Sequence, residues 1–271
     1  MEVIVSAANK KIKLAASLKQ KKHRDQEGLF LAEGIRLVEA AVDADWPAAY
    51  CLCTTDVMGA ERGQDLIERL EQMGCPVCQV PKDLYDKVSD TKEPQGVMLI
   101  LHKKAADLKD LEKIEKTPHI IVLDQLQDPG NVGTIIRTAD ASGCSAIILT
   151  KNSADVYAGK TVRAAMGSLF HLPVISDVST ADLLAFLSQK GISLQAAALD
   201  ATAKPYFSVD FTNPTAVAFG NEGNGLSEEI LSGAAQRIFI PMEGQSESLN
   251  VATAAAVVLF EGLRQRSIVQ R

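Results

Sequence analysis

The sequence has no apolar run approaching the roughly 20 residues that a membrane-spanning helix needs. Its first residues, Met1-Glu-Val-Ile-Val-Ser-Ala-Ala, also lack the basic start and long apolar stretch of a secretory signal. Internal repeats and low-complexity segments are absent as well. What remains is a chain of 271 residues, 46% apolar and 23% charged, which is typical of one large or two ordinary globular domains. We therefore expect a cytoplasmic protein without a membrane segment.

Cysteine is scarce, with five residues in the chain. Because the number is odd and the sequence has no secretory signal, we expect reduced thiols. The pairs Cys51-Leu-Cys53 and Cys75-Pro-Val-Cys78 could be drawn as a zinc site. The first pair, however, lies in an apolar, strand-like run, where free cysteine behaves as a small apolar residue. The second pair lacks the turn-forming sequence of a structural zinc site. We therefore expect no metal.

Positive charge is in deficit overall, since the net charge is −6, and this argues against a protein that coats nucleic acid. The charge is unevenly distributed, because the segment from Lys10 to Arg24 holds seven Lys or Arg and no acid. Such a segment can contact phosphate. The alternative is a solvated helix whose Leu14 and Leu18 face a core.

From His119 onward, short apolar runs alternate with segments of helical period, which predicts a mainly parallel sheet covered by helices on both faces. The part before residue 102 predicts a smaller α/β unit. The charged segment between them ends at Pro118 and is expected to connect two domains. The expected division is therefore a domain over 1–102, a linker over 103–118 and a second domain over 119–271.

Three stretches of the second domain share one pattern: residues 123–143, 216–229 and 240–259 each join a short apolar run to a polar turn and then to a helix. In parallel α/β folds, ligands bind at the carboxyl ends of the strands, so the three turns predict one site. The turns lack the Gly-x-Gly-x-x-Gly pattern of dinucleotide folds, a phosphate loop and any histidine. A Rossmann-type nucleotide enzyme is thus a remote alternative.

The motifs Asp128-Pro-Gly-Asn-Val-Gly-Thr-Ile-Ile-Arg137, Phe219-Gly-Asn-Glu-Gly-Asn-Gly-Leu226 and Ile240-Pro-Met-x5-Ser-Leu-Asn-Val-Ala252 resemble, in order and spacing, those of the SpoU, or TrmH, branch of the SPOUT RNA methyltransferases. The segment Gly28-Leu-Phe-Leu-Ala-Glu-Gly-Ile-Arg-Leu-Val38 resembles the ribosomal-protein-like substrate-binding domain of rRNA enzymes in that branch. This resemblance implies a deep trefoil knot, a homodimer formed by the C-terminal domain, and methyl transfer from S-adenosylmethionine to a ribose 2'-hydroxyl, with 23S rRNA as the expected substrate. The alternatives are a tRNA methyltransferase and a non-catalytic RNA-binding or ribosome-assembly protein. DNA is not an expected partner.

The resemblance also implies roles for particular residues. The expected catalytic residues are Arg137, Asn131, Glu222, Ser248 and Asn250. The expected cofactor-binding residues are Leu199, Gly220, Asn221, Glu222, Gly223, Ile240, Met242 and Leu249. The expected RNA-contacting residues are Lys10, Lys11, Lys13, Lys21, Lys22, Arg24 and Arg36.

Several of these residues have structural alternatives. Arg137 could pair with Asp140 one turn along a helix. Asn131 could cap the helix that it opens, and Ser248 or Asn250 could cap the last helix. Glu222 is expected to hold Arg137 or Asn131 in place. A guanidinium with a pKa above about 12 does not accept a proton, so Arg137 is expected to bind the neighbouring phosphate and stabilise the developing alkoxide.

Overall fold

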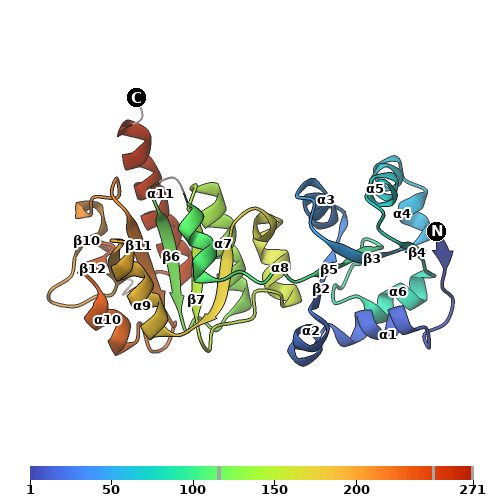
Figure 1. The fold of residues 1–271 in the computed structure, drawn as a ribbon, viewed down its shortest axis with the longest axis horizontal. Helices are drawn as coiled ribbons and strands as arrows, with labels where there is room; N and C mark the ends of the chain where they lie inside the picture. Colours follow the sequence, from blue (N-terminus) through green and yellow to red (C-terminus); the bar gives the residue numbers. More distant parts are fainter. Residues whose placement is uncertain (115–116, 246–247, 270–271) are drawn as a thin grey trace. The chain divides into compact units, whose positions relative to one another are not determined.

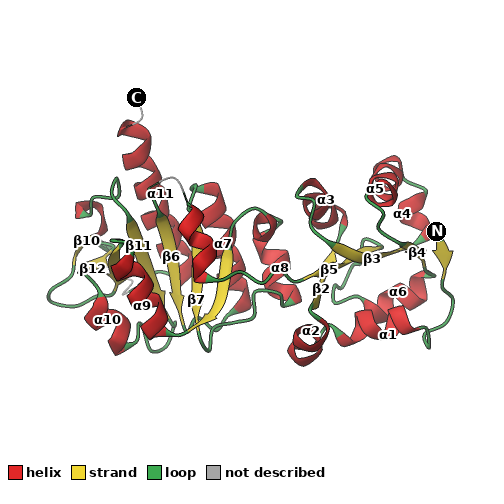
Figure 2. Ribbon diagram, viewed as in Figure 1, coloured by secondary structure: helices red, strands yellow, loops and turns green. Residues whose placement is uncertain are grey.

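The computed structural model describes residues 1–114, 117–245 and 248–269. The chain forms two compact units (Figure 1). The first comprises Met1–Lys104 together with Tyr157–Phe170, and the second comprises Ala105–Val156 together with His171–Arg271. Each unit has its own sheet with helices packed against it (Figure 2). No helix in the described ranges is both long and apolar enough to cross a bilayer.

The second unit is built on a parallel sheet, as the alternation of strand-like and helix-like segments predicts. Within the described residues the sheet has seven strands in the order β10-β12-β9-β11-β6-β7-β8, and every neighbouring pair is parallel. The strands are β6 (His119–Asp124), β7 (Ala146–Thr150), β8 (Val174–Val178), β9 (Ser193–Ala197), β10 (Lys204–Pro205), β11 (Thr215–Gly220) and β12 (Gln236–Phe239). The helices are α7 (Pro129–Ala141), α9 (Thr180–Gln189), α10 (Glu228–Gly233) and α11 (Val251–Val269), with 3-10 turns at Leu108–Lys113 and Tyr206–Ser208.

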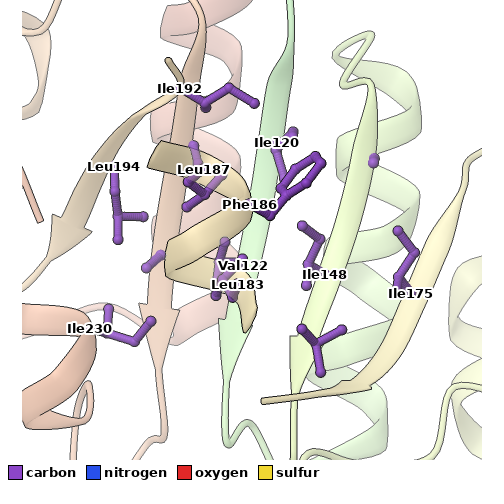
Figure 3. Packing of buried hydrophobic residues seen from close by; sticks show 14 of the residues in the cluster. Ile120, Val122, Ile148, Ile175, Leu183, Phe186, Leu187, Ile192, Leu194 and Ile230 are labelled. Atoms are coloured by element: carbon purple, nitrogen blue, oxygen red, sulfur yellow. The ribbon is translucent and has the colours of Figure 1, made fainter. Parts of the chain in front are cut away.

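Alternate residues of these strands face two different helical layers. Ile120 and Val122 of β6 and Ile148 of β7 pack with Leu183 and Phe186 of α9 in one buried cluster (Figure 3). The opposite face of the sheet is covered by α7 and α11, which pack against each other. The strands are therefore buried on both faces, which explains their continuous apolar sequences.

The segment before β6 belongs to this second core. Leu111, in the 3-10 turn, is 5% exposed and joins the cluster under α9, with Leu108 and Ile114 packed beside it. These residues fall in the stretch that the sequence assigns to a linker. The segment is short, and charged residues separate its three apolar side chains, so it does not stand out as an apolar pattern in the sequence. In the structure the three side chains share one face.

The first unit contains a mixed sheet, with the described strands in the order β1-β4-β3-β5-β2. The strands are β1 (Glu2–Val3), β2 (Leu29–Glu33), β3 (Ala48–Cys53), β4 (Val77–Gln79) and β5 (Val97–His102). The helices are α1 (Lys10–Ser17), α2 (Lys21–Glu27), α3 (Ile35–Asp43), α4 (Thr55–Met58), α5 (Glu61–Gln72), α6 (Lys82–Val88) and α8 (Gly159–Ala165), with a 3-10 turn at Ser168–Phe170. All five cysteines of the chain are free and buried, four of them in this unit.

Helix α8 follows a strand of the second sheet in sequence but packs with the first unit. The Tyr157 ring lies 4.7 Å from that of Phe30, and its hydroxyl donates to the Lys104 carbonyl at 3.0 Å. The Phe170 ring lies 5.1 Å from that of Trp46. These aromatic contacts anchor residues 157–170 on β2 and its neighbours, which a sequence pattern of alternating strands and helices does not indicate.

Candidate active site

The carboxyl edge of the second sheet is tied together by Asp124, the last residue of β6. Its carboxylate accepts a hydrogen bond from the Thr150 hydroxyl at 2.8 Å and another from the Ser227 backbone N–H at 2.7 Å. Asp124 is 1% exposed and lies in register with Gly220 at the end of β11. A buried carboxylate needs such donors. Sequence reasoning did not single out Asp124, although an acid that ends a wholly apolar run is a usable signal.

The turn after β11 is closed by Asn221 and requires glycine at position 220. Asn221 and Gly225 exchange two backbone hydrogen bonds of 2.9 Å, and the Asn221 Oδ1 accepts from the N–H of Gly223 at 2.9 Å. The Asn221 Nδ2 donates to the Gln125 carbonyl at 3.0 Å, which joins this turn to the loop after β6. A Cβ on Gly220 would lie 2.3 Å from the Gly225 backbone. Both the oxygen and the nitrogen of the Asn221 side-chain amide therefore hold the turn in place.

Three polar side chains from the three predicted turns meet at this edge. Asn131, in the first turn of α7, donates from Nδ2 to the Glu222 carboxylate at 2.7 Å. Asn250, just before α11, donates from its own Nδ2 to the Asn131 Oδ1 at 3.2 Å. The chain of contacts thus joins residues 119 positions apart in sequence. Glu222 holds Asn131, one of the two partners expected for it.

The helix caps differ from the expectation at one position. Asp128 caps α7, since its carboxylate accepts from the Asn131 backbone N–H at 2.8 Å and Pro129 occupies the first helical position. The interpretation of Asn131 as the cap is therefore wrong, and its side chain is left for Glu222. Asn250 does cap α11, because its Oδ1 accepts from the Ala252 N–H at 2.9 Å.

Arg137 lies further along α7 with an exposed side chain. No hydrogen bond or ion pair joins it to another described residue. The alternative pairing with Asp140 is not formed, since Asp140 lies 3.4 Å from the His171 ring instead. Arg137 is thus separate from the Asn131–Glu222–Asn250 contacts. Like those three residues, it does not line the neighbouring cavity.

A cavity of about 650 Å³ opens beside these turns. Four expected cofactor-binding residues line it, namely Leu199, Ile240, Met242 and Leu249, and Ser248 joins them. Gly220, Asn221, Glu222 and Gly223 do not line it, although Phe219 does. The remaining lining comes from residues that sequence reasoning missed, including Ala198, Tyr206, Phe239, Gln245, Ala254 and Val258. Residues 246 and 247 of the third motif lie outside the described ranges.

The wall formed by the loop after β9 is fixed by Asp200. Its carboxylate accepts from the hydroxyl and the backbone N–H of Thr202, each at 2.7 Å, and from the Arg237 guanidinium. The Thr202 hydroxyl, followed by Arg237, holds the pKa of Asp200 well below its usual range. The neighbouring Leu199 is 75% exposed and Met242 is 37% exposed. Apolar side chains held open at a cavity mouth indicate a ligand with an apolar face.

Two of the expected RNA-contacting residues have structural roles instead. Arg24 is 5% exposed, and its guanidinium donates to the Leu18 carbonyl at 2.7 Å and the Lys19 carbonyl at 2.9 Å, so it is not on the surface. It closes the end of α1, where orphan carbonyls attract a cation. Lys11 pairs with Glu2 at 2.7 Å. The exposed members of the expected set are Lys10, Lys13, Lys21, Lys22 and Arg36.

Comparisons with known proteins agree with this arrangement. The model described as the SpoU rRNA Methylase family matches residues 118–260, and the model described as the MRM3-like substrate binding domain matches residues 9–99. The 23S rRNA (guanosine(2553)-2'-O)-methyltransferase RlmP of Bacillus subtilis is 33% identical over 96% of this chain and 98% of its own length. The 23S rRNA (uridine(2479)-2'-O)-methyltransferase of Streptomyces viridochromogenes is 32% identical, covering 93% of this chain and 88% of its own. The crystal structure of an AdoMet-bound rRNA methyltransferase from Sinorhizobium meliloti superimposes with a TM-score of 0.87 at 32% identity, covering 97% of each chain.

Proposed function

Because this chain belongs to the SpoU rRNA Methylase family, we propose that it transfers a methyl group from S-adenosylmethionine to a ribose 2'-hydroxyl of 23S ribosomal RNA. The observation that carries this proposal is the meeting of Asn131, Glu222 and Asn250 beside one cavity at the carboxyl edge of the parallel sheet. Relatives that match along almost the whole chain modify 23S rRNA, and the domain over residues 9–99 matches a substrate-binding model. We expect the enzyme to act in the cytoplasm.

The cavity suits the cofactor in size and in the chemistry of its walls. A volume of about 650 Å³ lies within the range of small-molecule sites, roughly 300 to 1,000 Å³. Leu199, Ile240 and Leu249 supply apolar walls for the two faces of an adenine ring. Tyr206 and Gln245 supply polar groups for its edges and for the ribose. When bound, the cofactor supplies an electrophilic methyl group on a sulfonium.

The protein's own contribution is to orient the ribose and stabilise charge on its oxygen. Displacement at a methyl group needs the attacking oxygen in line, so a fixed arrangement supplies much of the rate. Glu222 and Asn250 hold the Asn131 amide from two sides. Arg137 binds the adjacent phosphate and stabilises the developing alkoxide, and the proton passes to phosphate or water because a guanidinium does not accept it.

A second copy of the chain completes the site in this proposal. Arg137 is exposed on α7 and does not line the cavity, while Phe260 and Ile268 of α11, the helix that packs on α7, are 47% and 60% exposed. Pairing of two chains through this region covers the apolar side chains and brings Arg137 of one protomer to the cavity of the other. Sedimentation equilibrium tests the dimer, and mixed dimers of Arg137→Ala and a cavity variant test the sharing.

The trefoil knot belongs to the same proposal. Membership of the SpoU rRNA Methylase family supports it, because the resemblance to that family implies such a knot. A crystal structure traced continuously through residues 246 and 247 tests whether α11 passes through the loop formed by the preceding turns. An open path there would remove the knot from the proposal but leave the cavity and its chemistry.

Methyl transfer is tested with methyl-labelled S-adenosylmethionine and unmodified 23S rRNA. The expected product is a single ribose that resists alkaline cleavage. Arg137→Ala should abolish the label and Arg137→Lys should keep little of it, since lysine lacks the two-pronged guanidinium. Near-full turnover by Arg137→Lys would show that methyl transfer does not need the two parallel N–H donors of the guanidinium. Label in tRNA, or cofactor binding by calorimetry without any transfer, would support the tRNA enzyme or the non-catalytic protein instead.

A further inference from the structure

A second cavity, of about 500 Å³, lies within the first unit. It is bounded by the junction of β2 and α3, by the loop that precedes β5, and by the end of α8. None of its lining residues belongs to the three motifs at the carboxyl edge of the second sheet. Its volume is sufficient for one nucleotide, since small-molecule sites start at roughly 300 Å³.

The walls of this cavity are held by hydrogen bonds. The Glu33 carboxylate accepts from the Thr91 hydroxyl at 3.0 Å, from the Asp90 N–H at 3.3 Å, and from the Ser89 hydroxyl, which fixes the loop over residues 89–91. Gln95 accepts from the Ile35 N–H at 2.9 Å through Oε1, so its Nε2 hydrogens remain available. These contacts join two segments about 60 residues apart, which indicates a preformed pocket.

Three arginines line the cavity, together with the two acids Glu33 and Glu93. Arg62 is neutralised by Glu39, which it meets through two hydrogen bonds of 2.6 and 2.5 Å. Arg36 and Arg163 have no hydrogen-bond or ion-pair partner within the ranges that the structure describes. None of the nearby acids pairs with Arg163 in the described ranges: Glu33 accepts from the hydroxyls of Ser89 and Thr91, and Asp90 pairs with Lys19 at 3.2 Å. Arg163 is half-buried, and a half-buried guanidinium that pairs with no acid is poorly compensated. A phosphate is the ligand whose oxygens match the fork of a guanidinium.

The cavity also presents an apolar surface beside these cations. Met166 is 49% exposed although it is a large apolar residue, and its backbone has a φ of 50°, in the left-handed region that residues other than glycine seldom adopt. Such conformations persist where the surrounding structure holds them, often at binding sites. Met166, Ile35 and Leu37 contribute apolar lining to the same cavity. A thioether is polarisable and packs well against an aromatic ring.

We propose that this pocket binds one unpaired nucleotide of the RNA substrate, separate from the nucleotide that is methylated. Arg163 and Arg36 bind its phosphate, Met166 packs against the face of its base, and the Gln95 amide donates to the edge of the base. Unpaired bases are the parts of RNA that proteins read by packing and by their edges. The inference rests on the proposed function for its RNA, and it assigns substrate recognition to α8, which lies within the sequence matched by the methylase family model.

The first test compares Arg163→Gln with Arg69→Gln. Arg69 lies on α5 of the same unit, pairs with Asp43 and does not line the cavity, so the control removes the same charge. Arg163→Gln should raise the KM for a 23S rRNA transcript about tenfold, leave kcat at saturating RNA and the cofactor affinity unchanged, and lower the slope of log Kd against log salt by roughly 0.7 to 0.9. Arg69→Gln should change none of these. Equal behaviour of the two variants would overturn the proposal.

Two further variants separate the base from the phosphate. Met166→Ala and Gln95→Ala should weaken RNA binding several-fold with an unchanged salt slope, because neither removes a charge. Melting curves of all variants identify any loss of folding. A transcript carrying 4-thiouridine should crosslink to residues 157–170 at a nucleotide other than the methylated one, and a crosslink confined to the methylated nucleotide would contradict the proposal.

The failure of this pocket and that of the proposed function can be distinguished. If the wild-type protein binds the transcript but methylates no ribose, the proposed function fails, and the RNA affinity of Arg163→Gln against Arg69→Gln still decides the pocket. If the wild-type protein methylates the transcript and Arg163→Gln retains its KM and its salt slope, the pocket fails alone.

Discussion

In the second unit three candidate side chains bond to one another across distant segments, whereas in the first unit Arg36 and Arg163 bond to no other described residue. Asn250, Asn131 and Glu222 form a continuous hydrogen-bonded chain. Arg163 and Arg36, in contrast, border a cavity and form no ion pair with its two acids, Glu33 and Glu93. The difference follows from the two tasks. Methyl transfer needs atoms held in line, while binding of a polyanion needs charges that are still available.

The largest effect is expected from a substitution at Gly220, which disturbs the turn after β11 in the second unit. A methyl group at this position would lie 2.3 Å from the Gly225 backbone, which cannot move without opening the 221–225 turn. We expect Gly220→Ala to destabilise the protein by about 3 kcal/mol or more and to abolish cofactor binding. Thermal melting and calorimetry with S-adenosylmethionine measure the two effects.

Gly191→Ala is the matched control for that change. Gly191 has a φ of 63°, but apart from its chain neighbours no atom of the described residues lies within 4 Å of the site of a Cβ. Its replacement should therefore cost only the backbone strain, about 1 kcal/mol, and leave the cofactor affinity unchanged. If Gly220→Ala behaved like Gly191→Ala, the turn after β11 would be far more pliable than its hydrogen bonds indicate.

The second unit should also be the more sensitive to acid, because the buried His119 ring has no hydrogen-bond partner among the residues that the structure describes. His119 is 2% exposed, and its ring packs edge-on against that of Phe211, with the ring centroids 5.7 Å apart. Burial, followed by the charge of Arg266, lowers the pKa of His119 to about 3. The unfolded chain takes up this proton near pH 6.5, so stability is complete above that pH and declines as the pH falls toward 3.

The size of that decline should reach roughly 3 kcal/mol at pH 4 if His119 acts alone, at about 1.4 kcal/mol for each pH unit. His119→Leu, which does not titrate, should flatten the curve of unfolding free energy against pH between 6.5 and 4. Chemical denaturation at several pH values measures both proteins. Parallel curves for the two would show that other groups govern acid unfolding.

The hydrogen-bonded chain itself is tested by Asn131→Ala. The change frees Glu222 and Asn250 without removing a helix cap, because Asp128 caps α7. We expect kcat/KM to fall about a hundredfold, as small displacements of positioning groups do, with an unchanged melting temperature and cofactor affinity. Thr134→Ala, one turn along the same helix, removes a hydroxyl that bonds only within the helix and should have little effect.

Much of this arrangement could be predicted from the sequence because it follows from order along the chain. Apolar runs and their spacing define the longer strands of both sheets, but not the two-residue strands β1 and β10. Parallel strands bring the loops at their carboxyl ends to one edge. The meeting of Asn131, Glu222 and Asn250 follows from that rule. What could not be predicted depends on contacts between distant segments. An example is the hydrogen bond that the buried Asp124 carboxylate accepts from the Ser227 backbone N–H.

The same limit explains the positions at which the sequence misled. Arg24 reads as one more cation in a basic run, but its carbonyl partners become visible only when α2 turns back on the end of α1. Asn131 is a good capping residue by type, yet Asp128 followed by proline occupies the cap first. Residues 157–170 follow a strand of the second sheet, and only the ring contacts of Tyr157 and Phe170 reveal that they pack with the first unit.

The smallest expected effects on stability and RNA affinity come from the basic segment over residues 10–24. There they distinguish a cation that is hydrogen-bonded within the protein from one that is exposed. Arg24→Ala removes a guanidinium bonded to the Leu18 and Lys19 carbonyls, so it should lower the unfolding free energy by about 1 to 3 kcal/mol. Lys21→Ala, three residues earlier and exposed, should leave stability unchanged and weaken RNA binding about two- to threefold, with a smaller salt slope. Denaturation and salt-dependent RNA titrations of both variants measure the contrast. If Lys21→Ala lost stability, or if Arg24→Ala altered only the salt slope, the distinction between structural and available charge would be wrong for this unit, and the RNA would contact the surface in a way that burial and hydrogen bonding do not predict.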